Sequence, residues 1–349
     1  MSELEETPER IECINNASPA ALDGLWVVCC IANPVGYKSR YDLYRKFVRH
    51  VLDDLAGNLV VVKCAYGDQE HALGLGGESL DPDADAAAAA EGRLLHVSLR
   101  ADSVLWHKEN LLNAGIRELK RLRPDARLVV WADADVTFVK GRSALADVAH
   151  ALARHKVVQC FSTCLDTGPK GEVLKLDHGY VFSAKHNLPL RSVKDHTTWH
   201  TGYVWAARLD FLDAVGGLFD RAILGSGDRL MADALCENLA SYETTAATRG
   251  DHRAVLEWGR KARAALGPGA DAIRAVGYVP VVISHGFHGF KKDRGYGTRG
   301  KVLADNAFDA SADLVVNADG LYEWAPGRAG SALVADVLAY FHSRNEDKR

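Results

Sequence analysis

Residues 127–138 read RLVVWADADVTF, an apolar and β-branched run that ends in two aspartates separated by one alanine. A short continuous apolar run of this kind predicts a buried β-strand. Asp133 and Asp135 leave the strand two residues apart, so their side chains point to the same side. Open α/β sheets bind their ligands outside the carboxyl ends of the strands. We therefore expect this acidic pair to face a ligand.

Three further apolar strands are predicted before this one. They are LWVVCCIA (25–32), NLVVVKCAYG (58–67) and LLHVSL (94–99). A helical pattern follows the first strand, and another spans about 104–122. Buried strands that alternate with helices are typical of a mostly parallel sheet. The predicted fold class is therefore α/β, with a mixed, mostly parallel central sheet flanked by helices.

The second half of the chain is less regular. Strands are expected at 156–161 and 278–284, and helices at 208–215, 228–240, 251–265 and 330–342. Residues 164–200 contain several glycines and prolines and are predicted to form a long irregular stretch.

The domain organisation follows from these elements. A polar leader is expected at 1–24, a single catalytic domain at 25–305, and a helical extension packed on that domain at 306–349. Residues 68–92 are rich in Gly, Asp and Ala and are predicted to be a surface insertion.

Charge and cysteine content argue against several classes of protein. The formal net charge is -4, which gives no electrostatic reason to expect binding to nucleic acid or to an anionic membrane. Seven cysteines without the close spacing of a disulfide scaffold are expected to be reduced thiols. The N-terminal stretch is acidic, and no apolar run reaches the length of a membrane span. We expect a cytoplasmic protein.

The aspartate pair suggests a cation site. Two neighbouring carboxylates repel each other until a cation arrives, and Mg²⁺ or Mn²⁺ can bridge carboxylates to phosphate oxygens. The pattern alone is weak, because it also occurs at Asp81–Asp83 and Asp83–Asp85. Both aspartates could also simply cap a turn.

A later segment offers complementary groups. Residues 285–299 read HGFHGFKKDRGYGTR, with His285 and His288 ahead of Lys291 and Arg294. Imidazole can supplement carboxylates around Mn²⁺, so both histidines are candidate ligands. Cations on a glycine-punctuated loop suit a diphosphate. The alternative is a solvated basic face with structural histidines.

A third group of residues suits a polar acceptor. His200, Tyr203 and Trp205 lie close together in the sequence, and aromatic rings offer apolar faces on which a sugar ring can lie. Asp228 could take a proton from an acceptor hydroxyl. It could equally act as the N-cap of the helix that follows it.

Taken together, these segments resemble nucleotide-sugar glycosyltransferases of the GT-A class, and within it the galactosyltransferase-like members. The matching segments are Asn33-Pro34 with Ser39-Arg40, Trp106–Asn113, Trp131–Asp135, Gly202–Trp205 with Val215–Gly217, Gly227-Asp228, and His288-Gly289. Gly227-Asp228 stands where inverting relatives more commonly have Glu-Asp.

The resemblance implies a GT-A (Rossmann-like) fold, with 25–140 as the nucleotide-sugar half and 141–305 as the acceptor half. It implies that Asp135 and His288 ligate Mn²⁺ or Mg²⁺, and that Asp133 contacts the metal or the donor ribose. Asp228 would be the general base of an inverting transfer. The donor would be a UDP- or GDP-linked sugar and the acceptor a glycan or glycoconjugate. The donor-binding residues implied are Asn33, Pro34, Arg40, Lys108, Asn113, Asp133, Lys291 and Arg294.

Two other functions stay open. A phosphatase resembling the haloacid dehalogenase group would use Asp133 as nucleophile and Asp135 as acid/base, with Thr137 completing the motif. In that group the motif normally opens the domain, whereas here strand-helix units precede it. A sugar- or nucleotide-binding module without catalysis is the third possibility.

Overall fold

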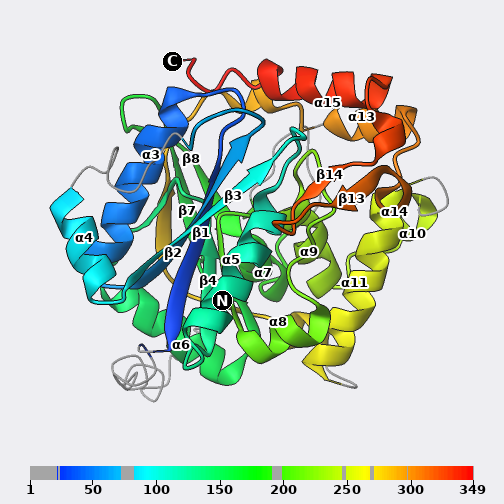
Figure 1. The fold of residues 1–349 in the computed structure, drawn as a ribbon. Coiled ribbons are helices and arrows are strands. Elements are labelled where there is room, and N and C mark those ends of the chain that lie inside the picture. Colours follow the sequence, from blue (N-terminus) through cyan, green and yellow to red (C-terminus); the bar gives the residue numbers. More distant parts are fainter. Residues whose placement is uncertain are drawn as a thin grey trace.

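A computed structural model describes residue 22 and residues 24–71, 82–190, 199–245, 249–267, 271–296 and 298–348. Its centre is a twisted sheet with helices on both faces (Figure 1). The predicted leader, apart from Leu22 and Gly24, lies outside the described residues, as do 72–81 of the predicted insertion.

The central sheet has seven strands in the order β11-β6-β10-β4-β1-β2-β3. The bounds are β1 Leu25–Ala32, β2 Asn58–Tyr66, β3 Leu94–Ala101, β4 Leu128–Ala132, β6 Val157–Gln159, β10 Val204–Arg208 and β11 Gly277–Tyr278. Strand β10 is antiparallel to both of its neighbours, and the other pairs are parallel. The predicted mixed, mostly parallel α/β sheet is confirmed.

Alternate residues of the central strands enter two separate cores. On β1, Trp26 and Val28 pack into the core beneath α5, α8, α9 and α11. Val27 and Cys29 face the opposite core, which α3 and α6 cover. Successive side chains of a strand point to opposite faces, so a strand that is covered on both sides must be apolar throughout. This is why β1 and β2 could be predicted from continuous apolar runs.

The helices have the following bounds: α3 Lys38–Arg49, α4 Pro82–Ala90, α5 Lys108–Leu122, α6 Ser143–Arg154, α7 Tyr180–Lys185, α8 Leu209–Val215, α9 Gly227–Leu235, α10 Ala240–Thr245, α11 Gly250–Leu266, α12 Ala272–Ala275, α13 Arg299–Asp305, α14 Ala310–Asp313 and α15 Ala332–Ser343. A π-helical turn at His50–Asp54 continues α3, and 3₁₀ turns occur at Lys291–Arg294 and Pro326–Arg328. Helix α5 starts four residues later than the 104 predicted, and α9 ends five residues before the predicted 240.

A second sheet carries much of the site. Its order is β5-β12-β7-β8-β9, with bounds β5 Val136–Phe138, β7 Thr163–Thr167, β8 Val173–Gly179, β9 Trp199–His200 and β12 Val282–His285. The acidic pair lies between β4 of the central sheet and β5 of this one. The chain thus passes from one sheet to the other through Asp133 and Asp135.

Two local predictions are corrected here, and part of the predicted insertion is found to be helical. Residues 164–200 were expected to be irregular, but β7, β8, α7 and β9 occupy most of the described part. The strand expected at 278–284 is two short strands, β11 and β12, in different sheets. Within 68–92, residues 82–90 form α4, whose Ala88 is buried in the core under α3.

The C-terminal part combines helices with a hairpin. Strands β13 (Leu314–Val316) and β14 (Tyr322–Trp324) pair antiparallel, and α13 and α15 pack beside each other at one end of the molecule (Figure 1). Their apolar side chains share a small core with Leu105, Ile223 and Leu224. Residues 344–348 then return to the start of α3, where Ser39 Oγ donates to the Glu346 carbonyl at 3.0 Å.

Candidate active site

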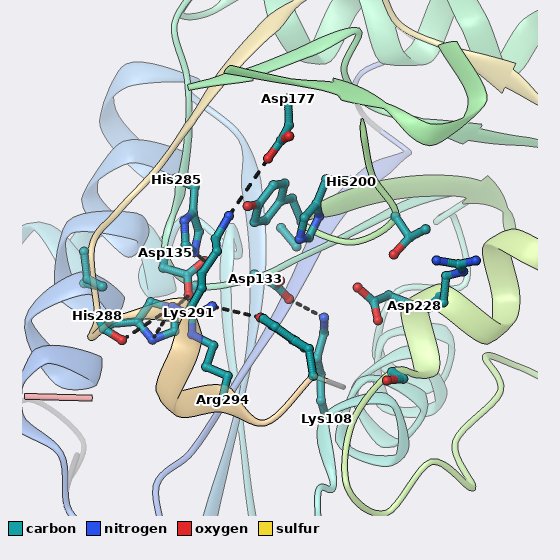
Figure 2. Close-up of a pocket in the computed structure, with 18 of the residues that line it drawn as sticks. Lys108, Asp133, Asp135, Asp177, His200, Asp228, His285, His288, Lys291 and Arg294 are labelled. Atoms are coloured by element: carbon teal, nitrogen blue, oxygen red, sulfur yellow. Dashed lines mark hydrogen bonds and ion pairs between the residues drawn. The ribbon is translucent and has the colours of Figure 1, made fainter. Parts of the chain in front are cut away.

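A cavity of about 530 Å³ lies where the carboxyl ends of β1 and β4 meet the second sheet. Asp135, His285 and His288 gather on one side of it, and Asp228 lies on the other (Figure 2). Its charged lining residues are Arg40, Lys108, Asp133, Asp135, Lys175, Asp177, Asp228, Arg229, Lys291, Arg294 and Arg299. Most of the residues predicted from the sequence are therefore brought together in one place.

Three buried residues form a potential metal-binding cluster. Asp135, His285 and His288 each offer a ligand atom, and these atoms all lie within 4.8 Å of one another. His288 Nε2 is 3.1 Å from Asp135 Oδ2, and His285 Nε2 is 3.7 Å from Asp135 Oδ1. Asp135 Oδ1 is buried and has no hydrogen-bond partner among the described residues. His285, the weaker of the two predicted histidines, is thus placed as well as His288.

Each histidine has a carboxylate at its other ring nitrogen. His285 Nδ1 is 2.7 Å from Asp166 Oδ1, and His288 Nδ1 is 3.2 Å from Glu346 Oε2. A carboxylate at Nδ1 accepts the single hydrogen of a neutral imidazole and leaves Nε2 with a lone pair. Metal-binding histidines usually have such a partner. Neither Asp166 nor Glu346 was predicted from the sequence.

The charges around Asp135 keep it ionised. Burial alone would raise the pKa of Asp135, but His285, His288 and Arg40 outweigh burial and hold that pKa well below its usual range. Burial, helped by Arg294, lowers the pKa of His288. The cluster therefore combines a carboxylate with a neutral imidazole, which are the protonation states that a metal requires.

Asp133 has a different partner from Asp135. Its carboxylate forms an ion pair with Lys108, in the first turn of α5, and its backbone N–H donates to the Tyr203 carbonyl at 2.8 Å. Asp133 also lines the cavity, but it is not a member of the three-residue cluster. Its predicted share in the metal stays a prediction.

The lining of the cavity also contains a stacked aromatic pair. The His200 and Tyr203 rings stack with centroids 3.7 Å apart and 10° between their planes. The Gly202 N–H donates to His200 Nδ1 at 3.0 Å, so the ring hydrogen is on Nε2. Burial lowers the pKa of His200 well below its usual range, which keeps it neutral.

Asp228 lies in the first turn of α9, and Gly202 lies next to its carboxylate. A Cβ on Gly202 would overlap Asp228 Oδ2, so the glycine makes room for this side chain. The alternative role of N-cap belongs by position to Ser226, and the structure has no side-chain cap there. Asp228 is therefore available to face the cavity.

Four predicted residues do not line the cavity, and two of them, Asn113 and Trp205, make other contacts. Asn113 is buried, donates to the Leu218 carbonyl at 2.9 Å and accepts from the Leu218 N–H at 2.8 Å, so its amide is fully engaged in holding the 217–220 loop. Trp205 donates to the Thr201 carbonyl at 2.7 Å and stacks on Trp131 in the core. Both side chains therefore have structural contacts that hold neighbouring segments in place.

Asn33 and Pro34 line a smaller neighbouring cavity of about 40 Å³, which Arg40 and Lys108 also border. The Asn33 amide donates to the Tyr37 carbonyl at 2.8 Å and accepts from its N–H at 3.0 Å. This side chain therefore shapes the loop between β1 and α3, at the edge of the main cavity.

The six cysteines within the described residues are free thiols, and Cys13 lies outside them. Burial raises the pKa of Cys30, which lines the cavity, to about 12. A thiol with such a pKa is a poor nucleophile at neutral pH.

The sequence matches no protein-family model and no curated protein. Among solved structures, the chain is similar to mannosyltransferase PcManGT from Pyrobaculum calidifontis in complex with GDP-Man and Mn²⁺. The two share 15% sequence identity, the match covers 93% of this chain and 88% of that chain, and the TM-score is 0.33. A protein named as a nucleotide-diphospho-sugar transferase from Desulfovibrio desulfuricans has 13% identity, covers 93% of this chain and 96% of its own, and has a TM-score of 0.30.

S. aureus TarS (1-349) matches 60% of this chain at 13% identity and a TM-score of 0.32, and the match spans about half, 53%, of the TarS chain. All three TM-scores are low, so the functional conclusions below rest on the site itself. Among the described residues, every helix is too short or too polar to cross a lipid bilayer.

Proposed function

We propose that the protein is a metal-dependent glycosyltransferase of the GT-A type, which moves a sugar from a nucleotide-diphosphate donor to an acceptor hydroxyl. The observation that carries the proposal is the cluster of Asp135, His285 and His288 near the carboxyl end of β4. The cluster lines a cavity that also contains several lysine and arginine side chains. A carboxylate with two imidazoles is a donor set that suits Mn²⁺, with Mg²⁺ as the second choice.

The cluster fits a divalent cation. Asp135 Oδ1 is buried without a hydrogen bond from the described residues, and both Nε2 atoms face the same carboxylate. A buried acceptor without a partner is costly unless something else satisfies it. A cation held there would offset the negative charge that develops on a leaving diphosphate.

Cationic side chains surround the same region and suit the donor. Arg40, Lys108, Lys291 and Arg294 all line the cavity, as a donor diphosphate requires. Lys108 is held in place by its ion pair with Asp133. Asp133, which directly follows β4 and lines the cavity, would contact the donor ribose. We expect the donor to be UDP- or GDP-linked.

The acceptor would bind on the side of Asp228. The His200 and Tyr203 stack forms a flat wall, and His200 Nε2 can donate a hydrogen bond. Asp228, as general base, would accept the proton of the attacking hydroxyl, which implies inversion at the sugar carbon. A glycan or glycoconjugate is the expected acceptor.

The two alternative functions explain less of the site. In the phosphatase, Asp133 would attack phosphorus, yet three strands of the sheet precede β4, and His285 with Asp166 would have no role. A module that only binds would have no use for Asp228 beside the acceptor wall.

The proposal is tested by nucleotide binding. Calorimetry with UDP and GDP in Mn²⁺ should detect one of them, and the affinity should fall at least tenfold in chelator and in Asp135→Asn. Asp102→Asn is a matched control, because Asp102 is an exposed aspartate at the end of β3 and does not line the cavity. Equal affinity with and without metal would contradict the metal-bridged donor.

A further inference from the structure

We infer that Glu346 is a positioning residue of the metal site: it fixes the ring of His288 so that Nε2 faces Asp135. This inference rests on the proposed function, because the purpose of the fixed ring is to bind a cation. It makes the site depend on residues 344–348, which lie outside the segments predicted from the sequence to hold the metal.

The contacts of Glu346 support this role. Its side chain is 2% exposed and receives hydrogen bonds or ion pairs from three groups: His288 Nδ1 at 3.2 Å, Arg40 Nε at 2.9 Å and Arg344 at 2.5 Å. Burying a carboxylate costs several kcal/mol unless it is paired, and the two arginines already pair it. The contact with His288 is therefore an additional feature of the site.

The hydrogen on His288 can be assigned from its neighbours. Arg294 Nη2 lies 3.1 Å from His288 Nε2 and 3.4 Å from Nδ1, and a guanidinium can only donate. Because Nε2 is the nearer nitrogen and the Glu346 carboxylate faces Nδ1, we place the hydrogen on Nδ1 and the acceptor at Nε2. Without Glu346, the same hydrogen would be drawn to Nε2, because Asp135 Oδ2 lies 3.1 Å from it. That tautomer has no lone pair to offer a metal from Nε2.

The segment that carries Glu346 is held in a defined position. Asp347 accepts hydrogen bonds from the Lys38 and Ser39 backbone N–H groups at 2.9 and 2.8 Å, at the N-terminus of α3. Gly289 follows His288 and has a φ of +81°. A Cβ there would lie 2.8 Å from the Glu346 Cα, so the absence of a side chain lets the two backbones meet. The close approach keeps Glu346 beside His288.

The corresponding pair in the other half of the cluster is His285 with Asp166, at 2.7 Å. Asp166 also receives Lys291 Nζ at 2.7 Å. Each imidazole of the cluster thus has its own carboxylate, and both carboxylates are further held by cations. This repeated arrangement is expected for ligands that must keep one orientation.

The experiment measures Mn²⁺ binding to the full chain by electron paramagnetic resonance, in wild type, Glu346→Ala and Glu346→Gln. Removing a carboxylate of this kind is expected to weaken metal affinity 10- to 100-fold in Glu346→Ala. Glu346→Gln should lie between the alanine variant and wild type, because its amide oxygen can still accept from Nδ1. Glu243→Ala is the matched control, because Glu243 is an exposed glutamate of α10, and it should bind Mn²⁺ within twofold of wild type.

Long-range ¹H–¹⁵N NMR of the histidines gives a readout without metal. In wild type His288 should carry its hydrogen on Nδ1, and in folded Glu346→Ala on Nε2. Mn²⁺ affinity within twofold of wild type in Glu346→Ala, or an unchanged His288 tautomer, would overturn the inference. If wild type binds no Mn²⁺, the proposed function fails, and the tautomer measurement still decides whether Glu346 positions His288.

Discussion

Metal binding should stabilise the folded protein by a predictable amount. Asp135 and the pair His285 and His288 come from two segments far apart in the chain, so the unfolded chain has no such cluster. A ligand that binds only the folded state at one hundred times its dissociation constant contributes about 2.7 kcal/mol. For 349 residues, with an unfolding entropy of about 2.1 cal/mol/K per residue, this corresponds to a rise in melting temperature of about 4 °C.

Differential scanning calorimetry with increasing Mn²⁺ measures this rise directly. Asp135→Asn removes the negative charge with little change in shape, so its melting temperature should change by less than about 1 °C over the same titration. Asp102→Asn should respond like wild type. The reasoning is refuted if wild type shows no rise, or if Asp135→Asn shows the same rise as wild type.

Three further predictions concern Asp228 and two buried residues of α5, Glu109 and Asn113. Asp228→Asn should lower kcat by about 10²–10⁴ with donor affinity unchanged, as steady-state kinetics and calorimetry would show; a normal kcat would remove Asp228 as base. Burial and the nearby Asp228 raise the pKa of Glu109 to about 7, although Lys108 opposes this change. The charged form is therefore disfavoured in the folded state, so wild type loses unfolding free energy as the pH rises from about 4.5 to 7. Urea titrations should show that Glu109→Gln gains about 3 kcal/mol of unfolding free energy relative to wild type between pH 4.5 and pH 8. A difference that does not change with pH would contradict the buried neutral acid. Asn113→Ala should cost about 1–3 kcal/mol of unfolding free energy but leave the donor KM unchanged, and a raised KM with normal stability would return Asn113 to the donor site.

The strands of the central sheet could be predicted because burial on both faces demands unbroken apolar runs. Strand β1 was predicted with its observed bounds, Leu25–Ala32. The second sheet could not, because β8 is largely exposed, with Val173 and Leu174 more than half accessible, and β9 has only two residues. Short strands that are only partly buried have no regular pattern of apolar residues from which they could be predicted.

The residues of the candidate site also fall into two groups, those that the sequence predicts and those that it does not. Asp135 and the two histidines could be singled out because the aspartate pair directly follows a predicted strand and the histidines precede a run of basic residues in a glycine-punctuated loop. Asp166 lies in a stretch that looked irregular, and Glu346 is one acid among many in a polar segment. Only the folded backbone brings these two carboxylates to the histidines. Asn113 was misplaced because a motif match does not reveal that its amide is already used by Leu218.

The most direct test of the central claim is turnover of a panel of UDP- and GDP-sugars by the full chain, with Mn²⁺ and with chelator. We predict that at least one donor is hydrolysed or transferred in Mn²⁺, that chelator stops the reaction, and that Asp135→Asn abolishes it. The account is contradicted if no donor is turned over and p-nitrophenyl phosphate is hydrolysed instead, with that hydrolysis lost in Asp133→Asn.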